Sequence, residues 1–587
     1  MFSATSDFKS LKMLAKSKNL QDSHIWHALL HLDKTGSPSI NTPRFLLSHG
    51  DFSPQKELDK TIEILLSDKK SACKYPARFL WLKSELNLPI ELRDSECSGF
   101  EEYIQKTSPK NIKLVFVSEQ VESPSSMMGH VFFKLEGAVA SGEKRENAVS
   151  FFTVIDTFNI PYLVVKSTIT GMNGYFILSP YKTQVDRYLN LEDRNIWEYE
   201  LTLNEEQKKL IYYHFWELKD IDITYLFAGF NCATIVDDML AIADENYKEG
   251  FYLWVTPKDV IKRAHKKGVI KKAKMTPSVN WELRMLGDSL DSDTIQNIKE
   301  ILKNRDMEAL DSFEFSQDEQ KRHLEKNLIL AYTNFLEKSG ERFSAVQKTA
   351  IAEKSKSDKA FVVDLSGYKN PINSPNSSKI TFRKGVGNDG FDELTFLPAS
   401  NELHDDNRQY FSESSLKIGE ITLSKNKTDV RLERLELFSM SSLTPWDSMT
   451  GSISKEFAMG IENQYDSKLQ KHQVFNTNVG FGLTKKLSDD LFVYGLGSLG
   501  IGANRDRQYV YAAPKMGVII YEVFNMKSAL EYAKIYNQTG SKNSYDSLLL
   551  YHSIFVNKSI NIGLRYHRKK NGDKNLHDSS LFLSYIF

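Results

Sequence analysis

Two short stretches carry residue types suited to nucleophilic chemistry. His130 closes a Ser- and Gly-rich turn, residues 123–130 (SPSSMMGH), and begins an apolar run. Cys232 stands directly before apolar residues at helical spacing, Ile235, Met239 and Ile242. A thiol is a nucleophile only as the thiolate, and a helix N-terminus together with a nearby imidazole lowers its pKa. The two residues therefore indicate a Cys/His thiol site.

The same residues also have an ordinary explanation, because a single cysteine or histidine is more often a buried core residue. Gly129, beside His130, would leave room for a substrate. For the oxyanion hole we expect the backbone N–H of Cys232, with supporting candidates Asn231, Ser126 and Ser125. The third, orienting group stays open among polar residues on the strands after His130: Ser150, Thr153 and Asp156.

Composition limits the function classes. A chain of 587 residues predicts about three or four domains. Lys+Arg and Asp+Glu both number 76, so the formal net charge is zero, which argues against a nucleic-acid-binding protein. No spacing resembles a zinc site, and we expect no metal or cofactor.

Three cysteines are too few for a disulfide scaffold. In an oxidising compartment the simplest assignment is one disulfide, Cys73 to Cys97, which leaves Cys232 free to react. Three reduced cysteines are the alternative. The first residues, 1–7, lack a basic region followed by an apolar one, so this numbering contains no signal peptide: either it begins after cleavage, or the start was placed too far downstream.

The elements that must position these residues fall into four regions. Residues 1–95 read as a helical N-terminal domain with no catalytic role, and residues 96–270 as an α+β thiol domain. Residues 271–376 read as a charged, helical connector. Residues 377–587 alternate apolar and polar side chains in segments of roughly ten residues, which is typical of an antiparallel transmembrane β-barrel of about 12 strands.

The barrel has a competing explanation. A soluble β-sandwich shares the alternation, and residues 431–438 are too charged for a clean lipid-facing strand. The final residues, 581–587 (LFLSYIF), resemble the C-terminal signature that the barrel-assembly machinery reads in bacterial outer-membrane proteins. An even strand number would put both barrel ends, and the preceding thiol domain, on the periplasmic side.

Five blocks in one order resemble a known family: residues 114–118, 123–130, 197–201, 214–218 and 230–234. They are similar to the Lnb N-terminal periplasmic domain family over roughly residues 95–270, and several ordered blocks are more specific than any single one. His130 precedes Cys232 by 102 positions (232 − 130), which resembles the circularly permuted NlpC/P60 papain-like fold.

The resemblance implies acyl chemistry. The characterised branch of the family moves an acyl chain on bacterial lipoproteins, with a cysteine nucleophile and a histidine base. We therefore expect an outer-membrane protein whose partners are outer-membrane lipid and a lipoprotein or other lipid-linked substrate. The alternatives are a peptidoglycan amidase or peptidase, or a non-catalytic periplasmic binding module anchored by the barrel.

Overall fold

The computed structural model describes residues 4–88, 97–107, 109–119, 128–139, 141–154, 162, 165–227, 229–248, 254–356, 367–386, 391–426, 429–466, 468–506, 508–537 and 543–587. The chain forms two compact units. The first comprises Met1–Ser118, Met128–Glu192 and Ile196–Thr276, and the second comprises Glu119–Met127, Asp193–Asn195 and Pro277–Phe587. Each unit is described by itself.

The first unit begins with a helical segment, residues 4–88, which we call the N-terminal segment. Its helices are α1 Ala4–Ser17, α2 His24–Leu29, α3 Pro54–Ser67, α4 Lys69–Ala72 and α5 Pro76–Leu86. Its core contains Trp26 and Trp81, whose rings stack with centroids 5.3 Å apart. Burial of such large aromatic areas stabilises a small helical segment.

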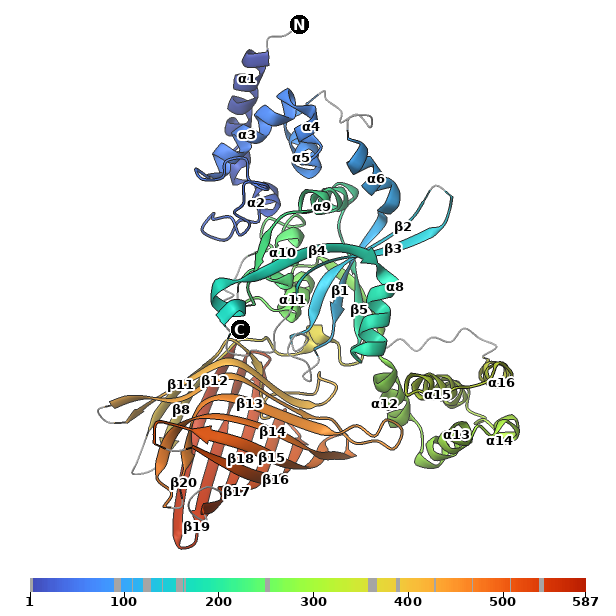
Figure 1. Ribbon diagram of the computed structural model, residues 1–587, viewed down its shortest axis with the longest axis vertical. Coiled ribbons are helices and arrows are strands. Elements are labelled where there is room, and N and C mark those ends of the chain that lie inside the picture. The colour runs from blue at the N-terminus through green and yellow to red at the C-terminus, as the bar shows by residue number, and fades with distance from the viewer. Residues whose placement is uncertain are drawn as a thin grey trace. The chain divides into compact units, whose positions relative to one another are not determined.

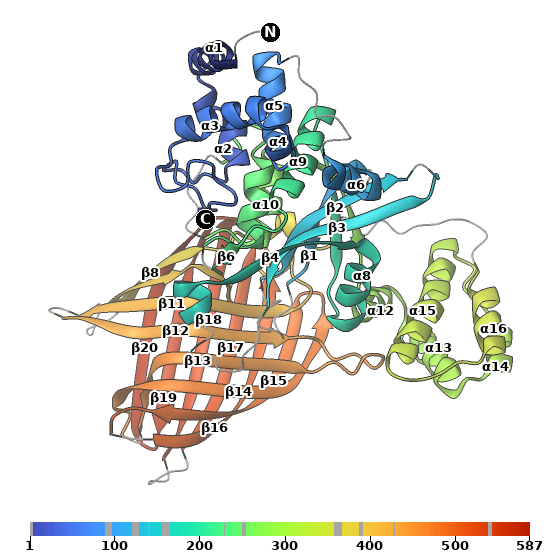
Figure 2. The same ribbon diagram turned by 45° about the horizontal axis from the view of Figure 1, so that its top comes forward.

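The thiol domain is built on a seven-stranded antiparallel sheet with the order β6-β4-β3-β2-β1-β5-β7. The strands are β1 Pro109–Val117, β2 His130–Ala138, β3 Lys144–Thr153, β4 Met172–Pro180, β5 Ile196–Leu201, β6 Ile223–Tyr225 and β7 Ile270–Thr276. Its helices are α6 Ser98–Thr107, α8 Tyr181–Val185, α9 Glu205–Glu217, α10 Cys232–Leu240 and α11 Pro257–Lys266, with the π-helical segments η3 Lys166–Thr170 and η4 Asp186–Leu191 (Figures 1 and 2).

The two faces of this sheet carry different helices. Phe133 pairs with Val149 across β2 and β3, so both point to one face, where Phe133 contacts Phe215 of α9. Phe151, on the same face, contacts Phe230 just before α10. The opposite face contains Phe132, and α8 and η4 cover it. We call these the α10 face and the α8 face.

The second unit contains a helical connector and a barrel. The connector helices are α12 Val279–Ser289, α13 Ser292–Asn304, α14 Met307–Ser312, α15 Glu319–Lys338 and α16 Ala345–Ser355. Their apolar faces form one buried cluster that also includes Met449 from the loop after β12. Arg284 of α12 donates to the Pro445 carbonyl of that loop at 2.9 Å.

Twelve antiparallel strands close into a barrel through the pairings β8 with β20 and β9 with β11. The strands are β8 Lys379–Val386, β9 Asp392–Leu397, β11 Glu413–Asn426, β12 Asp429–Leu443, β13 Ser454–Tyr465, β14 Lys471–Ser488, β15 Leu491–Ala503, β16 Gln508–Glu522, β17 Met526–Asn537, β18 Asn543–Asn557, β19 Ile560–Asn571 and β20 Lys574–Ile586. A short β10, Ala399–Asn401, extends the pairing with β11. The predicted fold class, multidomain with a helical start, an α+β domain and a 12-stranded barrel, is confirmed.

Side chains alternate across the barrel wall as the sequence predicts. Val479, Phe481 and Leu483 are exposed on the outside, whereas Asn476 on the same strand is buried in the lumen. The irregular charged stretch on β12 is explained by a β-bulge, since the register with β11 shifts at Glu433. The bulge re-aims the strand, so that Glu433 and Arg434 both line the lumen cavity of about 1340 Å³.

One end of the lumen is filled by protein. At the end that carries the chain terminus, an apolar cluster lies inside the wall: Leu443, Tyr494, Leu496, Ile519, Tyr521 and Phe555. Leu403 packs against it from an inward-folded segment, residues 402–412, which connects β10 to β11. Lys527 of β17 binds the Asp405 carbonyl at 2.9 Å, and Ser553 of β18 donates to the His404 carbonyl at 2.8 Å. The segment is therefore fixed across the lumen.

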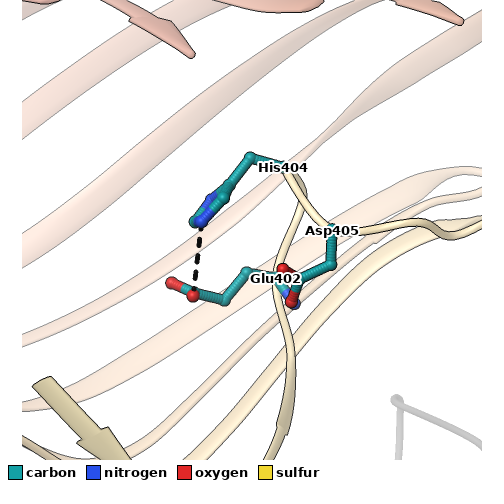
Figure 3. A group of neighbouring side chains, drawn as sticks. All are labelled: Glu402, His404 and Asp405. Carbon is teal, nitrogen blue, oxygen red and sulfur yellow. Dashed lines mark hydrogen bonds and ion pairs between the residues drawn. The ribbon is translucent and has the colours of Figure 1, made fainter. Parts of the chain in front are cut away.

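Figure 3 shows Glu402, His404 and Asp405 of this segment, with a ring nitrogen of His404 directed at the Glu402 carboxylate 3.5 Å away. They are a group of potential metal ligands among the described residues. Lys379 of β8 already pairs with both carboxylates, at 2.8 Å from Asp405. Its ammonium group balances one of the two negative charges and occupies the position between the carboxylates, so the cluster holds the segment to β8.

Within the part of the chain that the structure describes, no helix is both long enough and apolar enough to cross a membrane.

Candidate functional site

Cys232 is the first residue of α10 and is buried, 5 % exposed. Asn231 caps the helix, because its Oδ1 accepts the backbone N–H groups of Ala233 at 2.7 Å and Thr234 at 3.1 Å. The Thr234 hydroxyl accepts from the Asn231 N–H in return, which completes a capping box. The helix dipole therefore points its positive end at the thiol and favours the thiolate.

The amide of Asn231 is fully engaged in this turn. Its Nδ2 donates to the carbonyls of Phe227 at 2.9 Å and Val255 at 3.4 Å. Since both its donor and its acceptor sides have partners, the side chain positions Cys232 and does not offer a donor to an oxyanion. The backbone N–H of Cys232 stays the better candidate for that role.

Tyr225 is a site residue that the sequence reasoning missed. It is the last residue of β6, and its hydroxyl lies in hydrogen-bonding reach of both the thiol and the backbone N–H of Cys232. Burial raises the pKa of Tyr225 well above its ordinary value, and the neighbouring thiol adds to that rise. Tyr225 therefore stays a neutral hydroxyl that can donate a hydrogen bond. The only sequence signal was its position seven residues before Cys232.

His130 is oriented by Ser150. The His130 Nε2 lies 2.7 Å from the Ser150 Oγ, and Ser150 is 5 % exposed. Of the candidates for the orienting group, Thr153 instead donates to the Asn173 carbonyl at 2.8 Å. This contact fixes the orientation of the imidazole ring.

Gly129 is required by the backbone. Its φ is +81°, and a Cβ there would lie 2.8 Å from the Phe116 ring and 2.9 Å from the Val117 carbonyl. An L-residue is strained in this conformation, so glycine allows the chain to turn into β2. The space beside it is filled by Phe116 rather than kept for a substrate. Ser125, Ser126 and Asp156 lie outside the described residues.

The two pairs, His130 with Ser150 and Cys232 with Tyr225, lie at the same end of the sheet. β2 begins there with His130, and β6 ends there with Tyr225, since β6 pairs with the first residues of β4. Their faces differ, however. The pairing of His130 with Val117 directs its ring to the α8 face, whereas α10 packs on the other side. A proton transfer between the imidazole and the thiol would therefore have to take place past the end of the sheet.

Cys73 and Cys97 form a disulfide with a Cα–Cα distance of 5.4 Å. Cys232 is not part of a disulfide. The bond ties the start of α6 to the N-terminal segment, and Trp216 of α9 donates to the Cys73 carbonyl at 2.9 Å. Of the three cysteines, Cys232 is therefore the one that keeps a thiol.

Three family models match separate parts of the chain. Residues 99–266 match the model of the Lnb N-terminal periplasmic domain. Residues 18–85 and 369–585 match two domains of unknown function, DUF7843 and DUF7840. The resemblance drawn from the five sequence blocks is confirmed. No curated protein sequence matches the chain significantly.

Several solved structures are similar to the barrel part of the chain in fold. They include the KdgM porin (11 % identity, TM-score 0.24) and the NanC porin (11 %, 0.24), where the match covers 36 % of this chain and 99 % of the other. OmpT, an outer membrane protein of Vibrio cholerae, matches at 8 % identity and a TM-score of 0.20 over 36 % of this chain and 98 % of its own.

The closed barrel with its outward apolar side chains, together with the periplasmic domain family, places the protein in the bacterial outer membrane with its thiol domain in the periplasm.

Proposed function

We propose that this protein is an outer-membrane thiol acyltransferase or hydrolase that acts on a lipid-linked substrate, with Cys232 as the nucleophile. The observation that carries the proposal is the placement of a buried, non-disulfide thiol at the capped N-terminus of α10, beside the Tyr225 hydroxyl. A helix N-terminus favours the thiolate, and a hydroxyl and a backbone N–H at the same point can hold a developing oxyanion.

The reaction has two halves. The Cys232 thiol gives its proton to the imidazole of His130, and the thiolate attacks an ester carbonyl, whose oxygen is held by the Cys232 N–H and the Tyr225 hydroxyl. The ester C–O bond breaks, the leaving alcohol takes the proton from His130, and the acyl group stays on sulfur as a thioester. An amine or water then attacks the thioester, and the proton returns to the thiol.

Apolar side chains beside the histidine favour a lipid-linked substrate over a cell-wall peptide. Ile177 of β4 is directly opposite Ser150 in the register and is 39 % exposed on the same face. Tyr175, two residues earlier on that face, is also exposed. An exposed apolar surface next to polar groups suits an acyl chain next to its ester. The same chain continues into an outer-membrane barrel, so the domain would work in the compartment that borders such lipids.

The lipid preference is tested by two neighbouring substitutions. Ile177→Asn should lower turnover of long-chain substrates several-fold while leaving short-chain ester cleavage unchanged. Leu178→Asn is the matched control, since Leu178 is 42 % exposed but points to the other face. Equal losses of long-chain turnover in both variants would show that this surface does not bind the acyl chain.

The activity itself is tested with Cys232→Ala in cells. We expect mass spectrometry to show a changed acylation state of lipoproteins, with unchanged cell-wall peptides. Changed peptides with unchanged lipoproteins would support the amidase or peptidase alternative. If neither changes, the enzyme proposal fails and a binding module is left.

A further inference from the structure

A buried chain of polar side chains connects the N-terminal segment to α10. The Nε2 atoms of His31 and His214 lie 2.9 Å apart, and we call these residues the histidine pair. His31 Nδ1 lies 3.0 Å from an Asp238 carboxylate oxygen, and His214 Nδ1 lies 2.9 Å from one of Glu217. Both rings are fully buried, so water does not solvate them.

The chain continues into the N-terminal segment. The Glu217 Oε1 accepts the backbone N–H groups of Ala77 at 2.8 Å and Arg78 at 2.9 Å, in the first turn of α5. The Arg78 guanidinium in turn donates to Glu57 of α3 at 2.8 Å. At the opposite end, Lys248 pairs with Asp238. A carboxylate of the thiol domain therefore caps a helix of the N-terminal segment.

The hydrogen bonds of the histidine pair require one more proton than two neutral imidazoles carry. Glu217 accepts three donors, as an ionised carboxylate does. Burial raises the pKa of Asp238, but Lys248 and His31 outweigh it and leave that pKa below its ordinary value. Each Nδ1 must then donate to its carboxylate, and the contact between the two Nε2 atoms needs a third proton. Two neutral rings supply two.

The charge balance gives the same count. Asp238, Glu217 and Glu57 carry three negative charges, and Arg78 and Lys248 carry two positive charges. One extra proton on the histidine pair makes the cluster neutral. Tyr75, beside Arg78, adds no charge, because burial raises its pKa. Unbalanced charge is costly in a buried cluster, so neutrality favours the protonated pair.

We propose that the histidine pair holds one solvent-derived proton and acts as a charged clamp by which the N-terminal segment positions Cys232. The clamp contacts α10 on both sides of the thiol. Asp238 lies six residues after Cys232 (238 − 232), and the Phe230 ring, two residues before it, meets the His31 ring edge-on at 5.9 Å. The inference rests on the proposed function only in treating Cys232 as the reactive group. His31 and His214 are positioning residues.

The clamp has a defined pH dependence. Burial lowers the pKa of folded His31 from 6.5 to about 4, although Asp238 acts in the opposite direction. Between these values the unfolded state binds a proton on His31 and the folded state does not, so falling pH favours release. The clamp therefore weakens as the pH falls from 6.5 towards 4. Above pH 6.5 it also weakens, because the folded pair then holds a proton that two unfolded imidazoles do not hold. A second extra proton on the histidine pair would make both Nε2 atoms N–H donors, and two donors cannot form a hydrogen bond with each other.

Two measurements on the full chain in detergent test the clamp. At pH 7.5, His31→Gln should slow alkylation of Cys232 by roughly tenfold or more, because small misplacements of a reactive group are costly. His27→Gln is the matched control, since His27 lies in α2 and bonds to the Gln21 carbonyl outside the cluster. In the wild type, histidine C2-hydrogen exchange should place the titration midpoint of His31 near 4, with backbone exchange of residues 230–240 rising over the same interval.

Three outcomes would overturn the clamp: unchanged alkylation in His31→Gln, equal losses in both variants, or titration of His31 near 6.5. One bound zinc per chain would also overturn it, because two converging Nε2 atoms can ligate a metal. The wild-type titration decides the matter even if His31→Gln fails to fold. Because alkylation does not depend on acyl transfer, a clamp that passes these tests stands even if Cys232→Ala leaves lipoproteins unchanged.

Discussion

At the scale of single residues, the proposed site consists of two hydrogen-bonded pairs rather than one triad. Ser150 fixes the imidazole of His130, and Tyr225 adjoins the thiol of Cys232. In the proposed reaction each pair has a separate task, since His130 would move a proton and Cys232 with Tyr225 would supply the nucleophile and hold the oxyanion. Loss of either partner should therefore affect catalysis without unfolding the sheet.

Tyr225→Phe tests the oxyanion role. The variant removes one hydroxyl and keeps the ring that packs on Phe151 at 5.3 Å. We expect kcat to fall by about 10²-fold with little change in KM, the usual cost of one oxyanion-hole donor. Tyr213→Phe is the control and should keep wild-type kcat, because Tyr213 lies on α9 and its ring contacts Phe100 at 4.8 Å. A rise in KM alone would show that Tyr225 binds substrate in the ground state instead.

At the scale of elements, the cap of α10 determines where the thiol lies. The Asn231 side chain makes four hydrogen bonds, three within the turn before α10 and one to the Val255 carbonyl, and these hold the N-terminus of α10 beside Tyr225. Helix α10 is also held to the N-terminal segment by the contact between Asp238 and His31. The orientation of this one helix therefore depends on both its own sequence and the N-terminal segment.

Asn231→Ala should cost about 1 kcal/mol of stability, as the loss of a helix cap does, and should also slow alkylation of Cys232. Asn204→Ala is the matched control, because Asn204 closes the same kind of capping box at the exposed start of α9. We expect both variants to lower the thermal unfolding temperature, with only Asn231→Ala affecting the thiol. Unchanged alkylation in Asn231→Ala would contradict the positioning role.

At the scale of the whole molecule, the barrel has the features of an anchor more than those of an open pore. Its lumen contains a polar cavity at one end and a packed apolar cluster with residues 402–412 at the other. Lys379 and Lys527 hold that segment through buried ion pairs with Asp405 and Glu413. Breaking a buried pair by removing one partner leaves an uncompensated charge, which is strongly destabilising.

We therefore expect the purified protein to show no steady open conductance in planar lipid bilayers. The double variant Lys379→Ala, Lys527→Ala should release the segment and produce open-channel events. Lys534→Ala, on the outward side of β17, should behave like the wild type. A steady conductance of the wild type comparable to that of an open porin would refute the closed lumen.

Local patterns in the sequence determined the class of each region. Alternation along strands such as β14 specifies which side chains meet lipid, because the side-chain period of a strand is two. The spacing after Cys232 specified a helix that begins at the thiol. The charged stretch around Glu433 looked inconsistent with a barrel only because a bulge, which has no simple sequence signature, changes the facing direction.

Tertiary structure alone decided the partners of the buried polar groups. His31 and His214 are 183 residues apart, and Cys232 meets Tyr225 only because β6 adds to the edge of the sheet. The face to which His130 points follows from its register with β1, and the inward path of residues 402–412 follows from ion pairs with distant strands. Hydrophobic periodicity is a local property, so it can be read from neighbouring residues. A buried charge is instead paired with whichever group the fold brings next to it, and neighbouring residues do not specify that partner.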